Sequence, residues 1–307
     1  MNQTFFSALS ATLVLFFFIA CGYILRKTNA VPKNSAAVFS SVLMHFFIPV
    51  LILYIMTQNI TPEAIIAQKH QLITSFCIII ASCLLASVIA KVMDKGKSKK
   101  GVYTFTMAFS NFAFMGIPIV EAVYGPEAFT TLILFILPYY ILVNVLGDII
   151  IRDEKFPRVT TLISPITVSI VLGFVLVYTR TPIPKIVVEQ AHTIYASSIP
   201  LSMMLMGFVL AGKKITSMFT SLSTYFISAM RLILFPMITL IALWLLGFRG
   251  MALGVPVLIS GMPAAVNGVM LAENAGKDSF HCSSVVFIST LLSLLTIPML
   301  SYIVTLF

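Results

Sequence analysis

Ten stretches of about 20 apolar residues, each long enough to cross a bilayer, follow one another along this chain and restrict its fold. They are residues 5–25, 36–56, 71–90, 102–123, 128–150, 160–179, 192–211, 221–246, 251–273 and 282–305. Charged residues make up 9% of the 307 residues, whereas soluble domains carry about 25%. Because the bilayer core offers no water to the backbone, such segments cross it as helices. The sequence predicts an all-α polytopic membrane protein with ten transmembrane helices.

Lysine and arginine concentrate in alternate connections between these stretches. If the N-terminus lies outside, the cytoplasmic connections hold Arg26, Lys27, Lys33, Lys91, Lys95, Lys97, Lys99, Lys100, Arg152, Lys155, Arg158, Lys213, Lys214 and Lys277. The opposite connections hold only Lys69, Arg180, Lys185 and Arg249. Since basic residues favour the cytoplasmic side, we expect a multi-pass protein of a bacterial inner membrane with both termini on the non-cytoplasmic side.

The same asymmetry explains the net charge of +9. The basic residues belong to short connections on one side of the membrane, so we expect no nucleic-acid partner. The lysine-rich run at residues 95–100 is expected to contact anionic membrane lipid.

Two sequence landmarks recur at a constant spacing and indicate an internal repeat. The run G-Y-I-L-R-K-T at residues 22–28 matches G-F-V-L-V-Y-T at residues 173–179, an offset of 173 − 22 = 151. Pro49 and Pro200 are separated by the same number of residues. A unit of five helices crosses the membrane an odd number of times, so its second copy is inverted. We therefore expect two inverted five-helix repeats, residues 1–155 and 156–307.

The fourth and ninth stretches both carry residues that interrupt a helix. These are Asn111, Gly116 and Pro118 in the fourth, and Gly261, Pro263 and Asn267 in the ninth. A proline suits the first turn of a helix, so we expect a new half-helix to begin at Pro118 and another at Pro263. The free N–H groups and positive dipole ends of two such half-helices would form an anion site between them.

Two asparagines accompany the expected breaks. The amides of Asn111 and Asn267 can bind a carboxylate without placing an ionised side chain in the membrane. The alternative is that they only satisfy the backbone groups that the breaks expose. Both interpretations stay open on the sequence.

The run N-F-A-F-M-G-I-P-I-V-E-A-V-Y-G at residues 111–125 resembles the fourth-helix motif of the auxin efflux carrier family. That family includes plant PIN-FORMED exporters and bacterial permeases for malate and malonate. The run V-N-G-V-M-L-A-E-N at residues 266–274 resembles its second crossover. The resemblance implies a scaffold of helices 1, 2, 6 and 7 and a transport domain of helices 3–5 and 8–10. It also implies an elevator-like movement, with the substrate at the crossover of helices 4 and 9.

The resemblance further implies site roles for two residues of the fifth stretch. Continued without gaps from Gly125, Asn144 falls where the plant carriers have a site tyrosine, and Tyr139 falls near their site glutamine. Because Asn144 has no ring, a small aliphatic acid is favoured over an indole.

Three further residues are candidates for coupling transport to an ion. Asp148 could carry a proton or pair with Arg152 one helical turn away. Arg231 could attract the anion or extend to the membrane surface. His45 could take up a proton or remain a neutral, hydrogen-bonded side chain.

The sequence contains no nucleotide-binding or catalytic motif, so we expect a secondary transporter and not an enzyme, with no cofactor and no metal site. The expected substrate is a mono- or dicarboxylate such as malate, malonate or an auxin-like acid. The alternatives are a cation/proton antiporter, which would need a carboxylate near the midplane, and an anion-sensing receptor. A homodimer and coupling to H⁺ or Na⁺ are left open.

Overall fold

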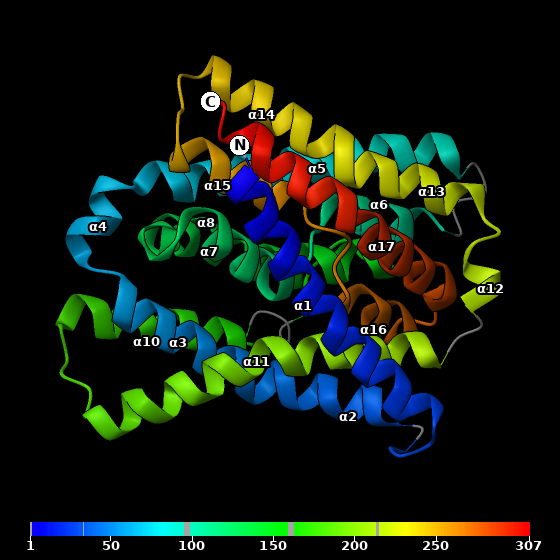
Figure 1. The fold of residues 1–307 in the computed structure, drawn as a ribbon, viewed down its shortest axis with the longest axis horizontal. Coiled ribbons are helices and arrows are strands. Elements are labelled where there is room, and N and C mark those ends of the chain that lie inside the picture. The colour runs from blue at the N-terminus through cyan, green and yellow to red at the C-terminus, as the bar shows by residue number, and fades with distance from the viewer. Residues whose placement is uncertain (1, 33, 95–98, 159–162, 213–214) are drawn as a thin grey trace.

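The computed structural model describes residues 2–32, 34–94, 99–158, 163–212 and 215–307. The regular elements in these ranges are helices (Figure 1). They are α1 (Asn2–Lys27), α2 (Ser35–Val42), α3 (Ile48–Asn59), α4 (Pro62–Ala67), α5 (Lys69–Met93), α6 (Lys100–Ala108), α7 (Ile117–Tyr124), α8 (Phe129–Arg152), α10 (Pro165–Thr179), α11 (Lys185–Ala211), α12 (Ile215–Met218), α13 (Leu222–Ala229), α14 (Phe235–Leu245), α15 (Met251–Ser260), α16 (Asn267–Asn274) and α17 (Ser279–Val304). Of the basic residues assigned to the cytoplasmic side, Lys33, Lys95, Lys97, Lys213 and Lys214 lie outside the described residues.

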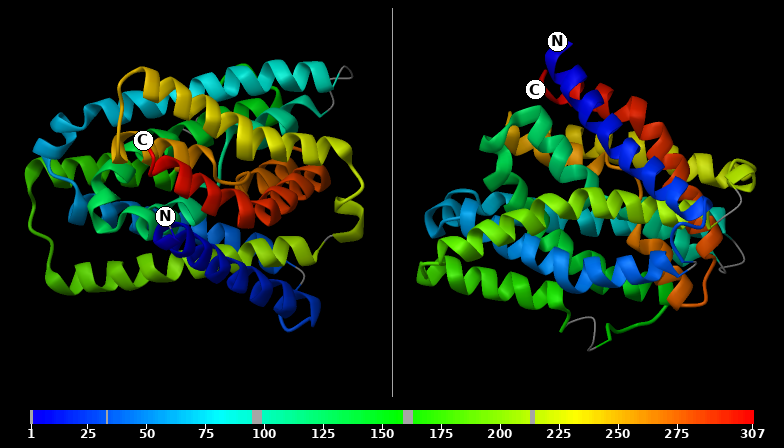
Figure 2. Two further views of the ribbon diagram at one scale, coloured as in Figure 1. Left: turned by 45° about the horizontal axis from the view of Figure 1, so that its top comes forward. Right: turned by 60° about the horizontal axis from the view of Figure 1, so that its bottom comes forward.

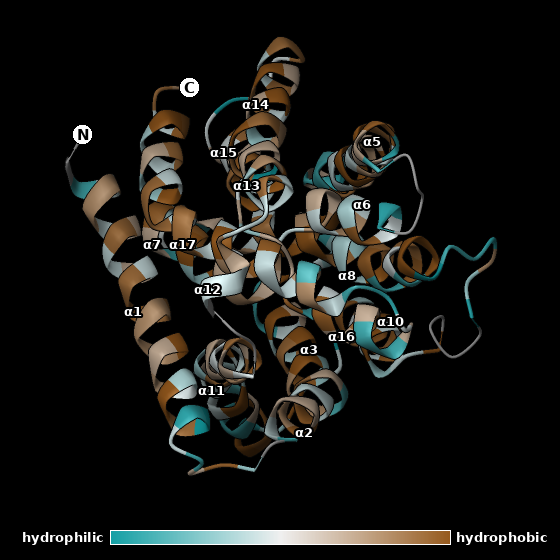
Figure 3. Ribbon diagram, turned by 90° about the vertical axis from the view of Figure 1, so that its right-hand side faces the viewer, coloured by the Kyte–Doolittle hydropathy of each residue, from teal (hydrophilic) through white to brown (hydrophobic). Residues whose placement is uncertain are grey.

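The helices have the length and composition of membrane spans. Within the described ranges, seven helices are long and apolar enough to cross a membrane, and three shorter apolar helices lie in the remaining predicted stretches. The shorter ones are Phe112–Tyr124, Pro165–Thr179 and Met251–Ser260. Hydrophobic residues make up most of the helices, and the strongly hydrophilic residues lie mainly near helix ends and connections (Figure 3). The described part of the chain is thus helical, and its several apolar helices are those of a multi-pass membrane protein.

Three helices contain a π-helical turn directly before an Xaa-Pro pair. The turns are Leu43–Phe47 before Pro49, Phe112–Gly116 before Pro118, and Met230–Leu234 before Pro236. A proline ring clashes with the carbonyl four residues earlier in a regular α-helix. A π-helical turn widens the backbone at that point, so each helix continues through its proline. These three prolines therefore do not end their helices.

Helix α1 packs closely along α11 through two glycines. A Cβ atom on Gly22 would lie 2.1 Å from the carbonyl oxygen of Met204, and one on Gly207 would lie 2.2 Å from that of Ile19. Only glycine permits this approach of the two backbones. On its other side α1 runs beside α17, and the start of α1 and the end of α17 lie near each other (Figures 1 and 2).

Candidate functional site at the helix crossover

Two extended segments cross in the interior of the bundle, where α6 and α15 end. Residues 109–111 separate α6 from the helix at Phe112–Tyr124, and residues 261–266 separate α15 from α16. Ser110 and Ala264 form an antiparallel bridge, and both are fully buried. The Asn111 N–H donates to the Pro263 carbonyl at 2.7 Å, and the Ala265 N–H donates to the Phe109 carbonyl at 3.1 Å. The two interrupted helices thus hold each other by their own backbones.

Hydroxyl groups from neighbouring helices satisfy the remaining amides of the bridge. The Ser110 N–H donates to the Tyr139 hydroxyl at 3.2 Å, and the Ala264 N–H donates to the Ser289 hydroxyl at 3.1 Å. Unpaired backbone groups are costly at membrane depth, so extended chain persists there only with such partners. Tyr139 also donates to the Ala108 carbonyl at 3.3 Å, which links α8 to the end of α6.

The breaks do not occur where the prolines predict them. The second part of the fourth span begins at Phe112, and Pro118 lies inside it, beyond the π-helical turn in which the Asn111 carbonyl accepts from Met115 and Gly116, both at 3.2 Å. Pro263 lies within the crossing segment, four residues before α16 begins at Asn267. The prediction that half-helices begin at Pro118 and Pro263 is therefore wrong.

Helix ends give a better alignment of the two interrupted spans than the prolines do. The first halves end at Ala108 and Ser260, an offset of 260 − 108 = 152. The second halves begin at Phe112 and Asn267, an offset of 267 − 112 = 155. The second crossing segment is thus three residues longer than the first, and it contains the helix-ending pair Gly261 and Pro263. A proline disfavours helical backbone in the residue before it, which explains why α15 cannot continue.

A small cavity of about 30 Å³ lies at this crossing. Its walls come from α2–α3, from both crossing segments and the helices that follow them, from α8 and from α10. The lining residues are Met44, Ile48, Ser110, Asn111, Phe112, Ala113, Phe114, Tyr140, Val143, Asn144, Ile166, Ala265, Val266 and Asn267. We call this cavity the crossover pocket.

Two buried polar groups of the crossover pocket have no hydrogen-bond partner. Asn111 is 4% exposed with its side-chain N–H₂ unpaired, and Tyr140 is 3% exposed with its hydroxyl unpaired. The Asn144 amide donates to the Tyr140 carbonyl at 2.8 Å, and Asn267 opens α16 in a half-buried position. Buried polar groups are normally hydrogen-bonded, so two unpaired ones in one cavity indicate a place for a polar ligand.

The backbone adds positive charge to the same place. The helix at Phe112–Tyr124 and α16 both begin at the crossover pocket, and the first N–H groups of a helix have no intrahelical acceptor. In α16 the N–H groups of Gly268 and Val269 donate to the carbonyls of Ala265 and Val266, so its contribution is mainly that of the helix dipole. Each N-terminus is equivalent to about +0.5 elementary charge. No aspartate or glutamate is among the described residues that line the pocket. This combination suits an anion.

Of the predicted site residues, three line the crossover pocket and five do not. Asn111, Asn144 and Asn267 line it. Gly116, Pro118, Tyr139, Gly261 and Pro263 lie behind or beside it and shape the backbone. Sequence reasoning missed Tyr140 and Ser110. Tyr140 precedes Asn144 by about one helical turn, so both residues lie on the same face of α8 and Tyr139 does not. Helical spacing from Asn144 would therefore have identified Tyr140.

Of the three predicted coupling residues, none lines the crossover pocket. His45 is exposed, and its Nδ1 lies 2.8 Å from the Ser41 carbonyl oxygen of its own helix. Asp148 accepts from the Arg152 Nε at 2.7 Å, the pairing that their spacing favours. Arg231 is 1% exposed, so it does not extend to the membrane surface, and its guanidinium donates to backbone carbonyls.

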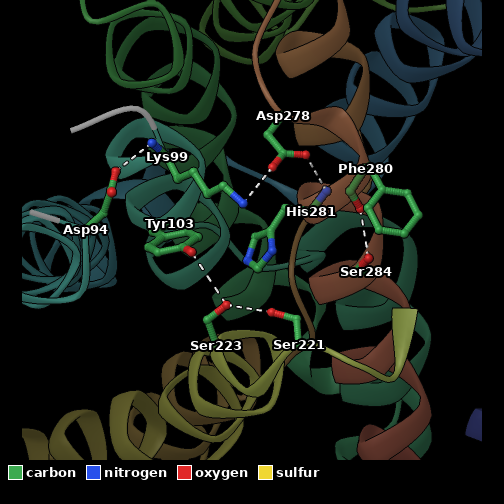
Figure 4. A network of polar contacts seen from close by, with 9 residues as sticks. All are labelled: Asp94, Lys99, Tyr103, Ser221, Ser223, Asp278, Phe280, His281 and Ser284. Atoms are coloured by element: carbon green, nitrogen blue, oxygen red, sulfur yellow. Dashed lines mark hydrogen bonds and ion pairs between the residues drawn. The ribbon is translucent and has the colours of Figure 1, made fainter. Parts of the chain in front are cut away.

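A polar network joins the connections at the far ends of α6 and α16 (Figure 4). The Lys99 ammonium lies 3.1 Å from the Asp278 carboxylate, and the Lys99 N–H donates to Asp94 at 2.6 Å. Asp278 also accepts from the His281 N–H at 2.9 Å and so caps α17. Burial raises the Asp278 pKa, but the hydrogen bonds from His281 and Lys99 outweigh it and hold that pKa below 3.8. This network fastens the two interrupted spans at one end.

A larger groove of about 410 Å³ lies between α5 and α14. It is lined mainly by aliphatic and aromatic side chains, among them Ile73, Leu85, Ile238, Leu243 and Phe248. It lacks the convergent polar groups that orient a small-molecule ligand. The crossover pocket, which has such groups, is therefore preferred over this groove as the candidate site.

Interrupted helices that cross at membrane depth, with helix N-termini aimed at one cavity, define a class of secondary transporters. The sequence matches the family model described as membrane transport protein, over residues 7–155 and 154–301. The chain belongs to this family, the auxin efflux carriers that its residues 111–125 resemble.

Two archaeal relatives match nearly the whole chain. An uncharacterized transporter of Methanocaldococcus jannaschii is 23% identical over 309 residues, which cover 96% of this chain and 98% of the relative. An uncharacterized transporter of Methanothermobacter thermautotrophicus is 23% identical over 303 residues, which cover 97% and 98%. The protein is a membrane transporter and not an enzyme.

Proposed function

We propose that this transporter carries a small organic anion, a mono- or dicarboxylate such as malate, malonate or an auxin-like acid, across the cytoplasmic membrane. The observation that carries the proposal is the crossover pocket, where two helix N-termini meet the unpaired Asn111 amide and the unpaired Tyr140 hydroxyl. A carboxylate accepts hydrogen bonds from all of these donors at once.

The charges around the pocket favour an anion over a cation. The two N-termini together supply about one positive elementary charge, which one carboxylate would balance. A cation/proton antiporter would need an acid at this place, and the described lining residues include none. Asp148, the nearest candidate on α8, is paired with Arg152.

The small size of the pocket supports a mechanism in which parts of the protein move to admit the substrate. A water molecule needs about 10–15 Å³ of such space, so a cavity of about 30 Å³ is too small for a dicarboxylate. Met44, Ile48 and Ile166 close it from α2–α3 and α10, and their withdrawal would admit the acid. We propose an elevator-type movement, in which the two crossing segments carry the acid past these residues.

The architecture behind this movement is two inverted five-helix repeats, residues 1–155 and 156–307, with ten transmembrane helices and both termini outside. The first halves of the two interrupted spans end 152 residues apart, close to the spacing of 151 between the sequence landmarks, which supports the repeat. Helices 1, 2, 6 and 7 would form the scaffold and the others the transport domain.

Uptake into proteoliposomes tests the proposed function. We expect saturable, protein-dependent uptake of at least one labelled mono- or dicarboxylate, with competition among acids of similar size. The neutral amides of the same acids serve as controls and should not compete. Proton flux driven by Na⁺ without any organic acid would identify an antiporter instead. A folded protein that moves no acid from a panel of small aliphatic and aromatic acids would contradict the proposal.

A further inference from the structure

Arg231 occupies a cage of backbone carbonyl groups on α6, α15 and the second crossing segment. Its Nε donates to the Met262 carbonyl at 3.0 Å, and one terminal nitrogen donates to Ser260 at 2.7 Å. The other terminal nitrogen donates to Met107 at 2.9 Å and to Ala108 at 3.1 Å. The side chain is fully enclosed, and none of the ion pairs in the described part of the chain includes it.

Three of these four carbonyls belong to the C-terminal ends of the two first half-helices. Met107 and Ala108 end α6, and Ser260 ends α15. A helix C-terminus is equivalent to about −0.5 elementary charge, so two of them together attract about one positive charge. In carriers with interrupted helices, such unwound carbonyls and C-terminal ends are where a coupling Na⁺ or H⁺ binds.

We propose that the Arg231 guanidinium is a built-in cation, which permanently fills the cation position between the ends of α6 and α15. The crossing segments then need no metal ion at this place, and their N-terminal ends remain free for the substrate. The guanidinium suits the position because its planar fork directs several donors at fixed angles. The inference that Arg231 fills the cage does not depend on the proposed function, whereas the consequence for transport rests on it.

Arg231 is in this view a positioning residue. It reaches from the π-helical turn between α13 and α14 to both interrupted spans, and so it fixes the two crossing segments relative to each other. Removing it would leave the carbonyls of Met107, Ser260 and Met262 buried without donors, each costly at membrane depth, while the Ala108 carbonyl would keep the Tyr139 hydroxyl. A small cation that enters the cage would restore part of this loss.

Chemical rescue of Arg231→Ala tests the proposal without any substrate. The purified variant should have a lower melting temperature than the wild type. Millimolar guanidinium, or Na⁺, should raise that temperature by roughly 2 °C or more, and choline at the same ionic strength should not. Arg249→Ala is the matched control, because Arg249 also donates to two carbonyls, those of Trp244 and Phe248, but on an exposed surface. The proposal would be overturned if guanidinium raised the melting temperature of Arg231→Ala no more than choline did, or no more than guanidinium raised that of Arg249→Ala.

Transport assays examine the consequence. Anion uptake by the wild type should be the same in Na⁺, K⁺ and choline media at fixed pH and membrane potential, whereas uptake by Arg231→Ala should rise severalfold when guanidinium or Na⁺ is added. Wild-type uptake that requires Na⁺ or K⁺ would overturn the proposal. Arg231→Lys covers the case in which the alanine variant does not fold. It keeps the charge, so its uptake should stay independent of added cations, and a Na⁺ requirement would again overturn the proposal.

These experiments separate failure of the proposed function from failure of this inference. If the wild type carried no acid, the proposed function would be wrong, yet rescue of Arg231→Ala stability would still identify the cage as a cation position. If acids were carried and no cation rescued the variant, the proposed function would stand and the built-in cation would be wrong.

Discussion

Two neighbouring tyrosines on α8 have different tasks in the crossover pocket. Tyr139 binds the Ser110 amide and the Ala108 carbonyl, while Tyr140 lines the pocket and its hydroxyl has no partner. Tyr139→Phe should therefore lower the free energy of unfolding by about 1–3 kcal/mol, because it leaves a buried amide unsatisfied. Tyr140→Phe should leave stability unchanged or raise it slightly, since it removes a hydroxyl that has no partner.

The same two variants should also differ in their affinity for the transported acid. A hydrogen bond to a charged group contributes about 1.5–3 kcal/mol, so Tyr140→Phe should weaken binding of the transported acid tenfold or more. The melting temperature and the dissociation constant of each variant provide the measurement. If Tyr140→Phe bound the acid as tightly as the wild type, the hydroxyl would not contact the substrate.

A second prediction concerns Asp278 and pH. Because the folded-state pKa of Asp278 lies below 3.8, its ionised form stabilises the fold. That contribution is present above pH 3.8 and is lost as the pH falls through the lower folded-state value. Asp278→Asn keeps a good helix cap but removes the charge that pairs with Lys99, so it should lower stability by about 0.2–1 kcal/mol at neutral pH and should flatten the acid limb of a plot of melting temperature against pH. An unchanged acid limb would show that another carboxylate causes it.

Sequence reasoning identified three polar residues of the pocket and missed two. Asn111 and Asn267 were recognisable because uncharged amides are conspicuous in apolar spans, and Asn144 because the family resemblance pointed to its position. Tyr140 was missed because the gapless family alignment pointed to Tyr139, one residue away. The carbonyl contacts of Arg231 were not predictable, since they join residues 29 to 124 positions apart and depend on tertiary packing.

At the scale of elements, proline has two different effects on the helices of the interrupted spans. Pro263 helps to end α15, whereas Pro118 lies inside a continuous helix because a π-helical turn accommodates its ring. A sequence shows that a proline will disturb a helix, but neighbouring groups decide how. Here the hydroxyls of Tyr139 and Ser289 stabilise the breaks by binding amides that lie two and three residues before the second half-helices begin.

Pro118→Ala tests the role of the π-helical turn. The new N–H can donate to the Phe114 carbonyl, so the turn can relax to regular α-helix and rotate Phe112 and Phe114 relative to the pocket. We expect a folded protein whose affinity for the acid falls by on the order of tenfold. Pro298→Ala is the control, because Pro298 lies inside α17, which has no π-helical turn and does not line the pocket. Equal affinities for both variants would contradict this role.

At the scale of the whole molecule, the long apolar stretches predicted a helical membrane protein, and the fold agrees. The orientation of the termini, the inverted repeat and the division into scaffold and transport domain stay predictions. They depend on the bilayer and on movement, which a single arrangement of the chain does not test. All three predictions bear on the crossover pocket, because both halves of the chain contribute residues to it.

The most direct test of the mechanism is to change the charge of the crossover pocket. Asn111→Asp adds a negative charge at a buried position and keeps the size of the side chain. The measurement is uptake of the transported acid into proteoliposomes by this variant and the wild type, with Asn59→Asp in the last turn of α3 as the control outside the pocket. The mechanism predicts that Asn111→Asp folds but loses acid uptake at neutral pH, because the new carboxylate repels that of the substrate, while Asn59→Asp retains it. Undiminished uptake by a folded Asn111→Asp protein would contradict the assignment of the crossover pocket as the anion site.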